Sequence, residues 1–143
     1  MEASITLDFS SYSNNIIEVI KLFGKIGWGI YNTKGEVEYL PIGDADKYNW
    51  QWGKMSEAEF FEMVSNKIAH NEQVGVNLFY SNGAEGISLL AHNTKQILLS
   101  IMINRRFVDK CHTDMVWYLE HIVYRFFKIG VRLLSYELKE YED

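Results

Sequence analysis

Residues 74–91, VGVNLFYSNGAEGISLLA, decide the fold because apolar side chains alternate on both sides of a turn-forming dipeptide. The alternating residues are Val74, Val76, Leu78 and Tyr80 before the dipeptide and Ile87, Leu89 and Ala91 after it. Such alternation is typical of strands with one buried face. Asn82-Gly83 between them favours a type I′ turn. The stretch therefore predicts an antiparallel β-hairpin.

Strand patterns also lie on either side of this hairpin. Residues 96–104 are apolar on both faces, which predicts a central strand, and Ile5, Leu7 and Phe9 alternate near the start of the chain. The segments 28–32 and 36–42 are joined by Thr33-Lys34-Gly35, which is typical of a second hairpin. Pro41 predicts that the second of these strands ends there or runs along an edge.

Three stretches have helical periodicity. The first follows a capping pattern formed by Asn15 and Glu18, and the second follows the S-x-x-E capping box of Ser56 and Glu59. Thr113 is the predicted N-cap of the third helix, which should end at Gly130. The expected buried positions are Phe60, Val64 and Ile68 in the second helix and Val116, Leu119, Val123, Phe126 and Phe127 in the third. Residues 131–141 fit either a strand or a continued helix, and Gly130 as a C-cap favours the strand.

The resulting order, β-α-β-β-α-β-β-β-α-β, predicts one α+β domain over residues 1–143, with about three helices packed on a mainly antiparallel sheet. Hydrophobic residues make up 48% of the chain, which is enough for a well-packed core. The single cysteine requires no oxidising compartment. The sequence also has no signal-peptide pattern and no apolar run long enough to span a bilayer. We therefore expect a cytoplasmic protein without membrane contact.

Negative charge is concentrated in the first half of the chain. Residues 1–72 contain eleven acidic and six basic residues, whereas residues 73–143 contain eight of each, for a net charge of −5. Nucleic-acid binding depends on neutralising phosphates with Lys and Arg. The charge distribution therefore argues against direct nucleic-acid binding and favours a basic protein partner.

Motifs for catalysis, cofactors and metals are absent from the sequence. The segment from Gly24 to Gly29 lacks the spacing of a phosphate-binding loop, and the four histidines are too dispersed for the common zinc motifs. Cys111-His112 is the strongest chemical cluster, since an imidazole near a helix start lowers the pKa of a thiol. Its simplest interpretation is a buried or half-buried cysteine beside a solvated histidine. We predict no catalytic residues, cofactor or metal.

The best candidate for a binding surface is the aromatic and acidic segment 44–54, DADKYNWQWGK, which we interpret as a loop. Tyr and Trp are enriched where proteins grip their partners, and acidic residues steer a basic partner toward them. The predicted partner-binding residues are Asp44, Asp46, Tyr48, Trp50 and Trp52. The tryptophans could instead cover the core, and their spacing of two predicts the same orientation for both.

In size, acidity, lack of catalytic motifs and possession of this segment, the chain resembles the immunity proteins of bacterial contact-dependent inhibition and related polymorphic toxin systems. The resemblance implies a protein that binds one cognate toxin domain, often a basic nuclease, and covers its active or substrate-binding site. An alternative is a small enzyme or small-molecule binder with a pocket between the sheet and the last helix near Cys111 and His112. A third interpretation is self-association through segment 44–54, so we expect a monomer or weak homo-oligomer.

Overall fold

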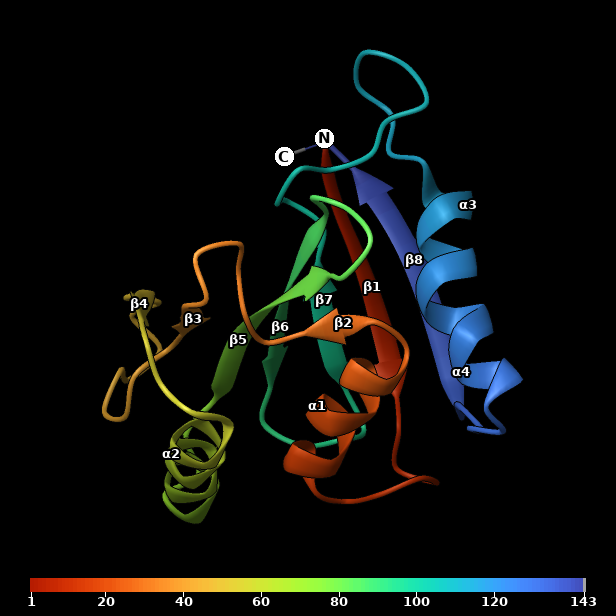
Figure 1. Ribbon diagram of the computed structural model, residues 1–143. Helices are drawn as coiled ribbons and strands as arrows, with labels where there is room; N and C mark the ends of the chain where they lie inside the picture. Colours follow the sequence, from red (N-terminus) through yellow and green to blue (C-terminus); the bar gives the residue numbers. More distant parts are fainter. Residues whose placement is uncertain (143) are drawn as a thin grey trace.

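The computed structural model describes residues 1–142 and confirms the α+β class, with three helices packed on an eight-stranded antiparallel sheet (Figure 1). The strands are β1 (Glu2–Asp8), β2 (Trp28–Gly29), β3 (Val37–Tyr39), β4 (Gln51–Gly53), β5 (Val74–Tyr80), β6 (Gly86–Ala91), β7 (Ile97–Ser100) and β8 (Ser135–Tyr141). Their order across the sheet is β4-β3-β5-β6-β7-β1-β8, and β2 pairs separately with β5. The central position predicted for the strand within 96–104 is confirmed, because β7 lies between β6 and β1.

Helices α1 (Ile16–Lys25) and α2 (Glu57–Ala69) precede the hairpin, and a third helix follows β7. This last helix consists of α3 (Met115–Tyr118), the π-helical turn η1 (Leu119–Val123) and α4 (Tyr124–Lys128). Figure 1 shows α1 and the last helix on the same side of the sheet. Their apolar faces form one core with the facing strand residues. Within residues 1–142, every helix is too short or too polar to cross a membrane.

The hairpin that decides the fold is present, but its turn differs from the prediction. Strands β5 and β6 pair from Val74–Ala91 to Phe79–Gly86. A type I′ turn needs a positive φ at both central residues, and neither Asn82 nor Gly83 has one. Instead the Tyr80 N–H bonds the carbonyl of Glu85 across a longer turn. The Glu85 carboxylate packs so close to Gly83 that a Cβ there would collide with it.

Two further local predictions need correction. The predicted hairpin over 28–42 is only partly formed, because β2 pairs with β5 and a single bridge joins Tyr31 to Val37. In α2 the capping box of Ser56 and Glu59 is present, but the last buried position is Lys67 and not the expected Ile68. The strand favoured over a helix for residues 131–141 is confirmed as β8, which pairs with β1.

The last helix differs from its prediction at both its cap and its buried face. Asp114, not Thr113, is the N-cap and accepts a hydrogen bond from the Trp117 N–H. Val116 and Phe127, expected in the core, are 62% and 41% exposed. Val123 and Phe126 are buried as expected, and the other buried positions are Tyr118 and Ile122. The π-helical turn Leu119–Val123 lies between α3 and α4, and its extra residue shifts the helical phase between them.

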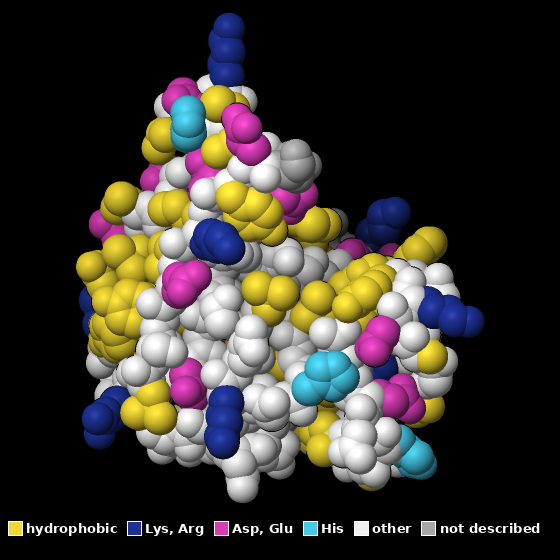
Figure 2. Space-filling view, turned by 180° about the vertical axis from the view of Figure 1, so that it is seen from behind, with side chains coloured by type: hydrophobic (Ala, Val, Ile, Leu, Met, Phe, Trp, Pro, Cys, Tyr) yellow, Lys and Arg dark blue, Asp and Glu magenta, His cyan; other side chains and the backbone are white. Residues whose placement is uncertain are grey.

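The sheet face opposite the helices carries a row of small polar side chains. Asn77 lies opposite Ser88, which lies opposite Ser100, and this in turn lies opposite Ser4 and then Lys139 on β8. The view from behind shows white atoms, which belong to the backbone and to uncharged polar side chains, between scattered charged and apolar groups (Figure 2). Asn77 and Ser88 in this row are buried, whereas Ser4 and Ser100 are half-buried.

Replacing Gly75 with alanine should lower the free energy of unfolding by about 1–3 kcal/mol, the usual cost of overpacking. A Cβ at Gly75 would lie 2.5 Å from Leu40 Cδ1 and 3.1 Å from Leu90 Cδ2. Urea denaturation followed by circular dichroism measures the change. The control is Gly24→Ala, because nothing lies within 4 Å of a Cβ at that helical position. If Gly75→Ala were as stable as the wild type, Leu40 would not be packed closely against Gly75.

Candidate protein-binding site

A hollow of about 460 Å³, which we call the Trp52 recess, opens beside β3 and β4. Its walls come from the turn before β3, from β3 and β4, and from the ends of β5 and of the segment after β7. The lining residues are Asn32, Thr33, Lys34, Glu36, Glu38, Trp52, Phe79, Ala84, Ile103 and Asn104. The recess thus combines two carboxylates, a large aromatic ring and an apolar floor.

Trp52 is the most exposed aromatic side chain of the described residues, at 70%. It does not lie in a loop, as the sequence predicted, but in β4, where it is paired with Glu38 of β3. Trp50, just before β4, is half-buried, and neither ring belongs to the core. A strand fixes the backbone of Trp52, so its ring can contact a partner at a smaller entropic cost than a ring on a loose loop.

The Glu38 carboxylate is held in place by amide groups. Asn77 Nδ2 donates to Glu38 Oε1 and Asn32 Nδ2 donates to Oε2, each at 2.9 Å. Ser88 Oγ in turn donates to Asn77 Oδ1 at 2.7 Å. This network fixes a negative charge beside Trp52 without a neutralising cation among its hydrogen-bond partners. The one basic side chain that lines the recess is Lys34, which is exposed.

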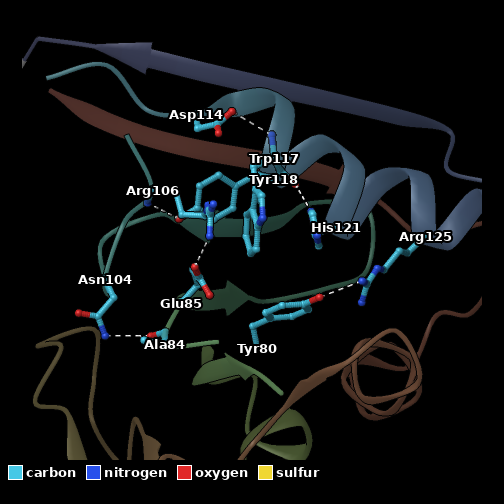
Figure 3. Close-up of polar contacts among 10 residues, drawn as sticks. All are labelled: Tyr80, Ala84, Glu85, Asn104, Arg106, Asp114, Trp117, Tyr118, His121 and Arg125. Carbon is cyan, nitrogen blue, oxygen red and sulfur yellow. Dashed lines mark hydrogen bonds and ion pairs between the residues drawn. The ribbon is translucent and has the colours of Figure 1, made fainter. Parts of the chain in front are cut away.

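The far wall of the recess is connected to the last helix (Figure 3). Asn104 Nδ2 donates to the Ala84 carbonyl at 2.8 Å, and the next residue, Glu85, pairs with Arg106 Nη1 at 3.0 Å. The Arg106 N–H donates to Tyr118 Oη on α3 at 3.1 Å. Burial raises the pKa of this Tyr118 hydroxyl above its usual value. These contacts hold the β5–β6 turn against the helix and support the wall from behind.

A second set of contacts fastens the same helix to β2 and β5. Trp117 and His121 stack with ring centroids 4.1 Å apart, and His121 Nδ1 donates to the Trp117 carbonyl at 2.7 Å. Arg125 Nη2 donates to Tyr80 Oη at 2.9 Å (Figure 3). The Trp28 indole donates to the His121 carbonyl at 3.0 Å. This cluster stabilises the scaffold on which the recess is built.

Segment 44–48 is a tightly organised turn. Asp44 is only 7% exposed, and its carboxylate accepts the N–H groups of Tyr48 and Asn49 at 2.9 Å each. Asp46 and Tyr48 are exposed, and both have positive φ, as does Ala45. Asp44 therefore organises the segment, while Asp46 and Tyr48 are the side chains available to a partner. Strained backbone of this kind is concentrated at functional sites.

The predicted site residues fall into two groups. Asp44 and Asp46 line a cavity of about 110 Å³ beside the end of α2, whereas Trp52 lines the separate recess. The floor of the cavity includes Lys67, which is 1% exposed, donates to the Pro41 carbonyl at 2.7 Å and lies 3.6 Å from Glu72 Oε1. Lys67 thus attaches the chain before segment 44–48 to α2.

Asp44→Asn should lower the free energy of unfolding by about 1–3 kcal/mol, because an amide has one acceptor oxygen and leaves one of the two N–H groups unsatisfied. Asp46→Asn, a matched control in the same turn, should change the free energy by less than about 0.5 kcal/mol because Asp46 is exposed. Chemical denaturation of both variants measures the difference. Equal effects would show that Asp44 does not hold the turn.

Cys111 and His112 lie in the loop between β7 and α3, and both are exposed, so the expected buried or half-buried cysteine is wrong. Hydrogen bonds from the N–H groups of Cys111 and His112 and from the His112 ring lower the pKa of Asp109 to about 2, and the Asp109 carboxylate raises the pKa of His112. Cys111 lines an open hollow of about 500 Å³ with Arg105 and Phe107, and His112 does not line it. This hollow is distinct from the predicted pocket between sheet and last helix.

Sequence reasoning missed Glu36, Glu38 and Asn32, which were assigned to a hairpin without a functional role. The signal was present in the alternation of Glu36 and Glu38 with Val37 and Tyr39, which places both acids on the solvated face of the strand. Their proximity to Trp52 depends on the pairing of β3 with β4 and could not be read from this alternation alone.

Comparison of the chain with protein-family models, with curated protein sequences and with solved structures gave no match. The geometry of the chain itself therefore carries the functional argument.

Proposed function

We propose that this protein is an immunity-type inhibitor that binds a basic toxin domain, often a nuclease in such systems, and covers its active or substrate-binding site. The observation that carries the proposal is the exposed Trp52 ring beside the fixed Glu38 carboxylate in an open recess. The protein acts by binding, in the cytoplasm, and without a cofactor. Its site is the Trp52 recess together with Asp46 and Tyr48.

The chemistry of the recess suits a basic side chain of the partner. A guanidinium or ammonium group gains from an indole face and from a carboxylate that is already oriented. Phe79 and Ile103 offer apolar contact for the aliphatic part of such a side chain. Glu36 adds a second negative charge to that of Glu38. Together the two carboxylates outweigh the single positive charge of Lys34.

The distribution of charge supports a partner that binds nucleic acid. A nuclease domain presents Lys and Arg to phosphates, so an inhibitor with fixed carboxylates competes for the same surface. Long-range attraction between the two proteins raises their association rate, and the buried aromatic contacts set the dissociation rate. The charge of −5 and the acidic first half of the chain fit this division of roles.

The test begins by capturing partners of the tagged full chain from the cells that encode it. The captured protein is then produced alone and together with the chain. We expect growth arrest in the first case, growth in the second, and loss of the partner's activity when the purified proteins are mixed one to one. A partner that is harmless alone, or one whose toxicity the chain does not relieve, would refute the proposed function.

Glu36→Gln combined with Asp46→Asn should slow association with this partner and flatten its dependence on salt, because Glu36 lines the open recess, Asp46 is exposed, and both charges are lost. Stopped-flow or biosensor measurements over a range of salt concentrations give the slope. The matched control is Glu120→Gln combined with Asp114→Asn, which removes two charges from the last helix. An unchanged slope in the first variant would count against steering by the recess.

A further inference from the structure

The loop between β7 and α3 projects from one end of the molecule (Figures 1 and 2). It carries three metal-ligating side chains within four residues. They are Asp109, Cys111 and His112, and one donor atom of each lies within 4.8 Å of the others. All three residues are exposed, so an ion can reach them from solvent. The loop is separate from the Trp52 recess.

The three donor atoms lie close together, within 4.8 Å of one another. His112 Nδ1 lies 2.8 Å from Asp109 Oδ2 and 3.5 Å from Cys111 Sγ. In a tetrahedral zinc site, the usual bond lengths place nitrogen about 3.4 Å from oxygen and about 3.5 Å from sulfur. The nitrogen and sulfur already have this spacing. The nitrogen and the carboxylate oxygen are at hydrogen-bond distance, so an ion would replace the hydrogen bond between His112 and Asp109, and the exposed carboxylate would move by about half an ångström.

The backbone of the loop prepares this arrangement. Asp109 Oδ1 accepts the N–H groups of Cys111 at 2.9 Å and of His112 at 2.7 Å, which leaves Oδ2 free of backbone donors. A bridge between Phe107 and Thr113 closes the base of the loop. The Thr113 N–H also donates to Glu140 Oε2 on β8 at 2.7 Å. The three donors are thus presented by a closed loop fastened to the sheet.

We propose that Asp109, Cys111 and His112 form a site for a divalent transition metal ion of the zinc class. A thiolate and an imidazole prefer such ions to Mg²⁺ or Ca²⁺, which require oxygen ligands. Binding releases the thiol proton and needs a neutral imidazole whose proton is on Nε2. Three protein donors leave the fourth position for water or for a donor from another molecule. The site is independent of the proposed inhibitory function.

The sequence predicted no metal site because it lacks the paired histidines or paired cysteines of the common zinc motifs. This donor set uses one residue of each type, D-x-C-H, with only one residue between the aspartate and the cysteine. Its neighbour Lys110 is exposed and its positive charge disfavours cations, whereas Glu140 nearby favours them. Arg105 also lines the hollow beside Cys111, so the donor atoms themselves must supply the affinity.

The test is titration of the full chain, reduced and stripped of metal by a chelator, with Co²⁺ and then with Zn²⁺. We expect one Co²⁺ per chain, an absorption band from thiolate-to-metal charge transfer, and displacement of Co²⁺ by Zn²⁺. Cys111→Ser should abolish the band, and Asp109→Asn and His112→Gln should each weaken Zn²⁺ binding by more than about tenfold. His92→Gln is the control, because His92 is an exposed histidine outside the loop.

Three results would overturn the site. They are an absence of stoichiometric binding, equal affinity of Cys111→Ser and the wild type, and a complex containing two chains per ion, which sizing of the loaded protein would reveal. Circular dichroism of each variant verifies the fold. Because the three side chains are exposed, none of these substitutions should unfold the protein.

Discussion

Trp28→Ala is expected to lower the free energy of unfolding by about 3–5 kcal/mol, the usual cost of deleting a buried aromatic residue. Trp28 is fully buried between the sheet and the last helix. Its ring lies 5.2 Å from that of Tyr80 and 6.1 Å from that of Trp117, centroid to centroid. The substitution removes both contacts and leaves a cavity at the junction that supports the recess.

The hydrogen bond of Trp28 can be separated from its packing. Trp28→Phe keeps an aromatic ring but leaves the His121 carbonyl, within the π-helical turn, without the indole N–H. We therefore expect an intermediate loss, of which about 0.5–1.5 kcal/mol comes from the lost hydrogen bond. Urea denaturation followed by circular dichroism measures all variants. A loss in Trp28→Ala no larger than in the exposed control Val116→Ala would contradict the packing role.

Trp52→Ala is expected to weaken binding of the toxin partner by at least about 30-fold, which corresponds to about 2 kcal/mol. The ring is exposed in the free protein, sits on a paired strand and adjoins the fixed Glu38 carboxylate. These features match those of interface hot spots, which are rich in tryptophan. Trp52→Phe should retain part of the affinity because it keeps an aromatic face.

Stability and binding should respond independently to this substitution. Because Trp52 makes little contact with the core, Trp52→Ala should change the free energy of unfolding by less than about 0.5 kcal/mol. Calorimetric titration with the captured partner gives the affinity. Val116→Ala, on the exposed side of the last helix, is the control for a residue outside the recess. Wild-type affinity of Trp52→Ala would place the interface elsewhere on the molecule.

The parts of the fold that local patterns predicted share a simple physical basis. A strand with one buried face must alternate, and a helix must start where a side chain satisfies its free N–H groups. The hairpin of β5 and β6, the capping box at Ser56 and the strand after Gly130 all follow these requirements. In the first two cases the deciding interaction joins residues close together in sequence, whereas β8 pairs with β1 near the start of the chain.

Predictions failed where contacts outside the repeating apolar pattern determined the local geometry. The π-helical turn in the last helix moved Phe127 out of the core, and Glu85 packed against Gly83 replaced the expected turn. Lys67 is buried at a position where helical periodicity favoured Ile68, because the Pro41 carbonyl and Glu72 provide it with polar partners. None of these partners is identifiable from the local pattern around the residue.

The candidate site shows the same division. The sequence by itself determined an acidic α+β protein, most of its strands and helices, and segment 44–54, rich in aromatic and acidic residues, as the candidate binding surface. Only the tertiary structure buried Asp44 within its own turn and brought Trp52 beside Glu38 and its two amide donors. The reason is strand register: pairing of β3 with β4 and β5 joins residues far apart in the chain, and their alternation specifies which face they occupy but not which neighbours they meet.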